Sequence, residues 1–139
     1  MRFLSRLPRS LPRQFRDRVR QACERAALND QTVTYQELAE AVIGDADRGS
    51  PDRRFIRLID AALCENMKDD AKARRPFSAV AVRRADTGHP GDHFVMQCIE
   101  LRRWDERQSI GEFVAAEWAK FREHVQARSV ARTNQAVAA

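Results

Sequence analysis

Residues 32–63 read TVTYQELAEAVIGDADRGSPDRRFIRLIDAAL and contain the start signals of two helices. The first signal is the capping-box pattern T-x-x-E of Thr34 and Glu37, in which each side chain accepts a hydrogen bond from the other residue's backbone N–H. The second is SPD at residues 50–52: a capping serine, a proline suited to the first helical turn, and an acid. The stretch therefore predicts two consecutive helices, preceded by a short strand at residues 32–33.

The chain beyond these helices predicts a β-hairpin. The second helix is expected to end near Lys68, followed by a charged linker at residues 68–75. Residues 78–83 alternate Ala and Val, which predicts a strand, and residues 93–101 are predicted as its partner. The segment ADTGHPGD between them is rich in turn-forming residues. This order predicts an α+β fold: a small winged helix-turn-helix-like domain with a β-hairpin and a C-terminal helix.

Helical spacing predicts one further helix on each side of this unit. Residues 12–28 place Phe15, Val19 and Cys23 on one face, and residues 110–127 follow a second capping box, Ser109 with Glu112. Residues 1–11 are predicted as a flexible basic arm, residues 12–128 as one winged-helix-like domain, and residues 129–139 as a disordered tail.

The composition favours an anionic partner. The chain has 139 residues, enough for one domain, and its 25 Lys and Arg exceed its 20 Asp and Glu, so its formal net charge is +5. Lysine occurs only at Lys68, Lys72 and Lys120. Arginine forms bidentate contacts with phosphate and guanine, which suits a nucleic acid. Codon bias in a GC-rich genome would produce the same excess of arginine, and both explanations stay open.

The cysteines and the hydropathy pattern indicate a cytoplasmic protein without a membrane partner. Cys23, Cys64 and Cys98 are odd in number, widely separated and form no C-x-x-C pair, which is typical of reduced thiols. No apolar run approaches the roughly 18 residues needed to cross a bilayer. The basic, acid-poor N-terminus is expected to be a flexible arm, with an organellar targeting signal as the alternative.

Residues 33–39, VTYQELA, resemble the V-[ST]-Y-G-E-L-A motif of the alkyltransferase-like proteins, relatives of the O6-alkylguanine repair enzymes. Gln36 stands where that family has glycine. The resemblance covers residues 15–94 and implies a DNA-binding winged helix. The family's acceptor motif P-C-H-R-V would fall at residues 76–80, which read PFSAV, without the cysteine or the histidine. The resemblance therefore implies binding without alkyl transfer. Residues 87–94, TGHPGDHF, also resemble a T-G-x-P-G-x-x-F segment of small bacterial proteins, which implies no function.

A winged helix would direct several side chains toward nucleic acid, with duplex DNA as the expected ligand. The first turns of the second helix would reach base edges or phosphates, the hairpin would contact the backbone, and a tyrosine hydroxyl would bind a phosphate. The predicted contacts are Tyr35, Arg53, Arg54, Arg57, Arg83 and Arg84. Each has a structural alternative: the arginines would pair with nearby carboxylates on a solvated surface, and Tyr35 would be a packing residue.

Neither an enzyme nor a metal or cofactor site is predicted. His89, Asp92 and His93 surround a turn, but their spacing matches no familiar zinc motif. Cys64 is expected beside cations such as Lys68, whose charge would lower its pKa, yet no histidine is placed to act as its base. The chain also lacks a P-loop and a dinucleotide-binding fingerprint.

The alternative function is a protein-interaction module, or a small inhibitor or accessory protein of a mobile element or phage–host conflict system. Trp104 would anchor a protein partner if it is exposed, because tryptophan is enriched at interface hot spots. The C-terminal helix offers a second docking surface. A protein complex that resists nuclease would favour this alternative over nucleic-acid binding.

Overall fold

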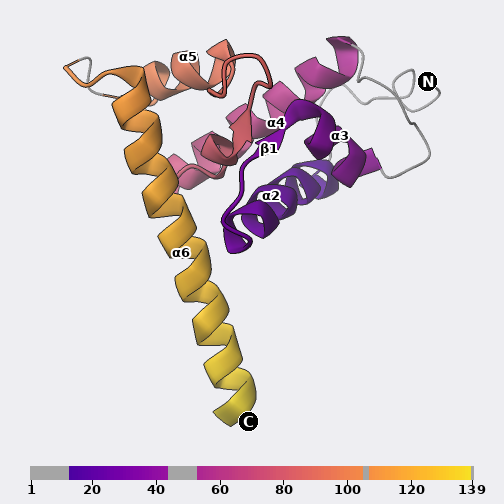
Figure 1. Ribbon diagram of the computed structural model, residues 1–139, viewed down its shortest axis with the longest axis vertical. Coiled ribbons are helices and arrows are strands. Elements are labelled where there is room, and N and C mark those ends of the chain that lie inside the picture. The colour runs from indigo at the N-terminus through magenta and orange to yellow at the C-terminus, as the bar shows by residue number, and fades with distance from the viewer. Residues whose placement is uncertain (1–12, 44–52, 105–106, 139) are drawn as a thin grey trace.

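The computed structural model describes residues 13–43, 53–104 and 107–138, with the backbone alone at residues 43, 53–55 and 136–138. The predicted arm at residues 1–11, the turn at residues 44–49 and the helix start at residues 50–52 lie outside the described part. Most of the described chain is helical (Figure 1). Its elements are α2 (Arg13–Leu28), β1 (Val33–Thr34), α3 (Tyr35–Ile43), α4 (Arg53–Lys72), the 3₁₀ helix η1 (Ser78–Ala81), β2 (Val82–Arg83), α5 (Asp92–Glu100) and α6 (Ile110–Ala138).

The predicted α+β winged helix with a β-hairpin is wrong. The strands of the described chain are β1 and β2, which pair in parallel with Val33 beside Val82 and Thr34 beside Arg83. The first expected hairpin strand is mostly η1, and the second is the helix α5. The two strands run parallel and come from distant segments of the chain, whereas a wing is an antiparallel hairpin formed by two consecutive strands.

The burial pattern of α5 explains the error. Phe94, Gln97 and Cys98 are buried, which is the i, i+3, i+4 spacing of a helix face. Met96, which an alternating strand would place beside Phe94 and Cys98 in the core, is 66% exposed. Gly91 occupies the N-cap and Asp92 lies in the first turn, where a negative charge favours the helix dipole. The helical period therefore decided the structure of this segment.

The predicted starts of α3 and α6 are confirmed at the level of single hydrogen bonds. Thr34 Oγ1 accepts from the Glu37 N–H, and Glu37 Oε1 accepts from the Thr34 N–H, both at 3.2 Å. Ser109 Oγ accepts from the Glu112 N–H at 3.1 Å. The predicted apolar face of α2 is also confirmed, because Phe15, Val19 and Cys23 are buried.

Helices α2, α4 and α5 all end at a residue other than glycine with a left-handed backbone. Asp30 and Arg74 have φ of 56°, and Arg102 has φ of 55°. In each case the N–H of the following residue bonds a carbonyl five positions back, the Schellman arrangement. The usual glycine signal is therefore missing at these ends, and α4 continues to Lys72 through part of the predicted linker.

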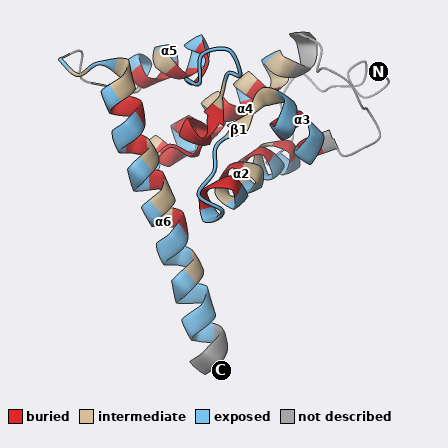
Figure 2. Ribbon diagram, viewed as in Figure 1, coloured by how far each residue is buried: buried red, intermediate tan, exposed pale blue. Residues whose placement is uncertain are grey.

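The core forms around the segment that links α4 to β2. Residues 77–82 are all buried, and η1 packs against α2, α4 and α6 (Figure 2). The Phe77 ring meets the Phe94 ring edge to face, with centroids 6.3 Å apart. An extended apolar run excludes water best where helices cover it from several sides, and three helices do so here.

Asp70 of α4 connects this core segment to α2, because it binds both Ser78 and Arg20. Its carboxylate is 0% exposed and accepts hydrogen bonds from Arg20 Nη1 at 2.6 Å and from Arg75 Nε at 2.7 Å. The backbone N–H of Ser78 donates to the same carboxylate at 3.1 Å. Asp70 is therefore a buried ion-pair centre on α4, at a position predicted to be a charged linker.

Helix α6 continues past the body of the protein. It was predicted to end at Ala127 and runs to Ala138, so the stretch predicted as a disordered tail is helical up to that residue. Val125 is its last buried residue, and residues 126–135 are exposed except for half-buried Ser129. Figure 1 shows this part projecting away from the other helices. None of the described helices, α6 included, is long and apolar enough to cross a membrane.

Candidate functional site

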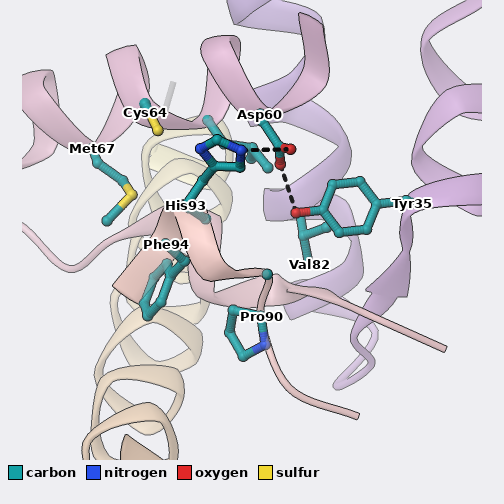
Figure 3. A pocket seen from close by; sticks show the side chains of 11 residues that line it. Tyr35, Asp60, Cys64, Met67, Val82, Pro90, His93 and Phe94 are labelled. Carbon is teal, nitrogen blue, oxygen red and sulfur yellow. Dashed lines mark hydrogen bonds and ion pairs between the residues drawn. The ribbon is translucent and has the colours of Figure 1, made fainter. Parts of the chain in front are cut away.

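A polar cluster joins three elements where α3 begins, and Asp60 lies at its centre between Tyr35 and His93 (Figure 3). The capping box fixes the first turn of α3 and directs the Tyr35 side chain toward α4. There Tyr35 Oη donates a hydrogen bond to Asp60 Oδ1 at 2.7 Å. The hydroxyl that was predicted to bind a phosphate is therefore engaged with a carboxylate, and binding a phosphate through it would require that bond to break.

The second carboxylate oxygen of Asp60 faces α5. His93 Nε2 lies 3.8 Å from Asp60 Oδ2, and the His93 side chain is 64% exposed. Burial raises the pKa of Asp60, although the Tyr35 hydrogen bond and the charge of His93 act in the opposite direction. Burial and the bond to Asp60 likewise raise the pKa of Tyr35, so the phenol stays protonated as the donor. The cluster is thus a Tyr–Asp–His chain that runs from the interior to solvent.

The loop before α5 covers this chain closely. A Cβ atom added at Gly91 would lie 2.9 Å from Tyr35 Oη, so only glycine fits against the hydroxyl at this position. The hollow between Tyr35, Asp60, Pro90 and Phe94 has a volume of about 10 Å³, which is room for roughly one water molecule. A substrate-sized ligand does not fit there, so the geometry favours a structural cluster over an active site.

Cys64 lies one helical turn beyond Asp60, and its pKa is raised. Burial raises its pKa, and the charge of Asp60 adds to that effect, whereas Lys68 lowers the pKa. Burial also raises the pKa of Cys23 and of Cys98 to about 12. Lys68 acts on the Cys64 pKa in the predicted direction, but desolvation and the Asp60 carboxylate outweigh it, so the pKa is raised overall.

The arginines predicted on the second helix lie at the start of α4. Arg53 and Arg54 are in its first turn, and their side chains lie outside the described part of the structure. Arg57 is exposed and pairs with none of the described carboxylates. Of these arginines, Arg57 is the one that the structure shows available to a ligand.

The two arginines predicted on the hairpin have different environments. Arg83 is half-buried: its Nε donates to the Val80 carbonyl at 2.9 Å and its Nη1 to the Gly88 carbonyl at 3.2 Å. Arg84 is exposed and makes a bidentate contact with Asp86, at 3.1 and 2.9 Å. Arg83 therefore holds the loop, while Arg84 lies on the surface with its charge already compensated.

The remaining candidate residues do not assemble a site in the described part of the chain. No group of three or more His, Cys, Asp or Glu side chains among the described residues is arranged to hold a metal ion, and His89 and Asp92 are both exposed. Trp104 is half-buried against the core, and its Nε1 donates to the Gln108 carbonyl at 3.0 Å. Its indole is therefore a packing group with a satisfied donor rather than an exposed anchor.

The sequence analysis missed the role of the two α4 aspartates. Asp70 continues the buried spacing Ile59, Ala62/Leu63, Asn66/Met67, so its position on the apolar face was a usable signal. Asp60 carried no comparable signal, because its partners Tyr35 and His93 come from distant segments. Comparisons with protein-family models, curated proteins and solved structures found no match to this chain. The resemblance to the alkyltransferase-like proteins stays a prediction from the sequence.

Proposed function

We propose that this protein binds nucleic acid without catalysis, with duplex DNA as the principal ligand, through the outer face of α4. We define the α4 basic face as Arg57, Lys68 and Lys72. These residues are spaced i, i+11 and i+15, which places them along one side of a helix. All three are exposed, and none forms an ion pair with a described carboxylate.

The observation that carries the proposal is that the neighbouring carboxylates of α4 itself, namely Glu65, Asp69 and Asp60, are bound by residues of other elements. Glu65 and Asp69 pair with Arg16 of α2 at 3.2 and 3.5 Å. Asp60 is bound by Tyr35. The three cations of the α4 basic face are therefore not neutralised by their acidic neighbours. A face of net positive charge that is exposed along a helix suits a polyanion.

The dimensions of the face also suit a nucleic acid. Residues 57–72 span about 22 Å along the helix axis, whereas duplex DNA carries one charge for about every 1.7 Å of its axis. The three cations would therefore each meet a different phosphate. Arg53 and Arg54, in the first turn of the same helix, remain predicted contacts, and Arg84 would contribute only if it left Asp86.

Fluorescence anisotropy with labelled duplex DNA, single-stranded DNA and RNA tests the proposal across a salt series from about 50 to 200 mM. The key variant is Arg57→Gln/Lys68→Gln. The matched control is Arg18→Gln/Lys120→Gln, which removes one arginine and one lysine from exposed positions on α2 and α6 that form no ion pair with a described residue. We expect the α4 variant to reduce the slope of log affinity against log salt by about 2, or about 1 for each lost phosphate contact.

Two outcomes would contradict the proposal. One is the absence of binding by the parent protein at low salt. The other is an equal loss in the α4 variant and in the control, because this would show a general charge effect without a binding face. Circular dichroism of both variants confirms that each is folded before affinities are compared.

A further inference from the structure

The side of α6 that is buried against the core continues, as a row of side chains, into the projecting C-terminal part of the helix. Along this row Phe121 and Val125 are buried against the core, and the next positions on the same side are Arg128, Ser129 and Arg132. Guanidinium groups cannot follow apolar side chains into a core without partners. The change from apolar to basic residues therefore explains why α6 separates from the other helices at this point.

The separation opens a groove of about 260 Å³ between the C-terminal part of α2 and α6. Leu28 provides the open apolar surface in it and is 47% exposed although it is a large aliphatic residue, whereas Val125 lies at its buried base. Arg128 closes one side through an ion pair with Glu24, at 2.8 Å. The groove is thus a partly apolar hollow that no other described element fills.

The charge of the groove is positive. Arg25, Arg128 and Arg132 line it together with a single carboxylate, Glu24, which Arg128 already binds. Arg25 and Arg132 are exposed and form no ion pair with a described residue. Residues 124–139 contain no Asp or Glu that could neutralise them. Two guanidinium groups therefore face the groove with free donors.

From these observations we infer that the groove between α2 and α6 docks an acidic, partly apolar segment of a partner protein. Carboxylates of the partner would bind Arg25 and Arg132, where bidentate geometry is available. Its aliphatic side chains would cover Leu28. The partner would also supply packing for residues 126–135, because a short helical segment is marginal in water without tertiary contacts.

The apolar surface distinguishes a protein segment from a nucleic acid. A phosphate backbone would satisfy the arginines equally well, but it would leave the exposed Leu28 side chain uncovered. The C-terminal part of α6 from a second copy of the chain is disfavoured as the occupant of the groove, because its arginines would lie against the arginines of the groove. The inference does not depend on the α4 basic face, which is formed by residues of another helix.

A phage-displayed library of short random peptides, selected on the intact protein, tests this inference. The selected peptides are then tested for binding to the groove variant Arg25→Glu/Arg132→Glu, and those that no longer bind are separated from those that still do. Arg18→Glu/Lys120→Glu serves as the matched control. We expect the peptides lost on the groove variant to be net acidic and to contain aliphatic residues. Their affinity should fall at least roughly tenfold in that variant and stay unchanged in the control.

The labelled DNA of the salt series, applied to the same variants, separates the two kinds of ligand. Selected peptides that lack net negative charge, or that bind the groove variant as tightly as the parent, would overturn the inference. So would a loss of DNA affinity in the groove variant as large as that in Arg57→Gln/Lys68→Gln, because the groove would then belong to a nucleic-acid surface. Circular dichroism and thermal denaturation establish that the charge-reversed protein is folded.

Discussion

Asp60 and Asp70 lie on the same helix, yet their environments differ in almost every respect. Asp70 is fully buried and receives hydrogen bonds from two arginines and a backbone N–H. Asp60 is only partly buried and receives one bond from a neutral phenol, with an exposed histidine 3.8 Å away. The first carboxylate has full ionic compensation in a dry site, whereas the second has a single neutral donor near solvent.

This difference shows that the acidic side chains of α4 are compensated by different partners on two sides of the helix. Asp70, together with the Arg16 pairs to Glu65 and Asp69, takes up the charges on the side of α4 that meets α2. The Asp60 carboxylate is bound by Tyr35 and faces His93 on the side of α4 that meets α3 and α5. Of the cations on this helix whose side chains the structure describes, Arg57, Lys68 and Lys72 are left exposed, which is the basis for the proposed α4 basic face.

The strongest test of the comparison is Asp70→Asn. Removing this charge would leave Arg20 and Arg75 without their shared partner, and loss of one member of a buried ion pair costs about 3–5 kcal/mol. We expect the free energy of unfolding in urea to fall by about 3 kcal/mol, the lower end, because both arginines can regain some water. Asp69→Asn, next to it but exposed, should cost no more than about 1 kcal/mol. Equal losses in the two variants would contradict the buried-centre interpretation.

A second, smaller effect is expected at the Asp60 cluster from Gly91→Ala. The new methyl group would press on Tyr35 Oη at 2.9 Å, and such overpacking costs about 1–3 kcal/mol. Tyr35→Phe should rescue this variant, because the next ring atom, Cζ, is 3.8 Å away. A double-mutant cycle in urea measures the coupling. Gly111→Ala is the control, since nothing lies within 4 Å of its added methyl, and additive losses would argue against the close contact.

The smallest expected effect concerns protonation of Asp60. Its folded-state pKa is raised, so its contribution to stability is present at low pH and is lost as pH rises above 3.8 through the raised value. Tyr35→Phe removes the hydrogen bond that opposes this shift, and should move the pKa of Asp60 further upward. His93→Gln should act in the same direction by a smaller amount. Carbon-13 NMR titration of the Asp60 carboxyl measures both changes, and a downward shift in Tyr35→Phe would contradict the geometry.

The helix starts were the part of the fold that the sequence predicted best. Thr34, Glu37 and Ser109 act within four residues of their partners, so their hydrogen bonds are local and visible as a pattern. The helix ends were harder, because Asp30, Arg74 and Arg102 replace the expected glycine. Residues 92–100 carried both a strand-like and a helix-like apolar pattern, and the resemblance to a winged helix favoured the wrong one.

The contacts of the candidate site residues, unlike the helix starts, depend on the tertiary structure and could not be predicted from local spacing. Arg83 and Arg84 are neighbours in sequence, but the fold turns one toward the interior and leaves the other on the surface with Asp86. Tyr35 and Asp60 are separated by 25 positions, and no local spacing announces their bond. Glu117 and Arg103 are separated by 14 positions, and the buried Glu117 carboxylate lies 4.0 Å from Arg103 Nη2.

The sequence by itself determined the properties that act over one or two helical turns: the capped starts of α3 and α6, the apolar face of α2, and the excess of arginine over acid. Tertiary structure alone decided which arginines are neutralised, because that depends on carboxylates brought from other helices. It also decided which of the two apolar patterns in residues 92–100 is buried. Local hydrogen bonds are encoded by spacing, whereas burial and charge compensation depend on which surfaces meet.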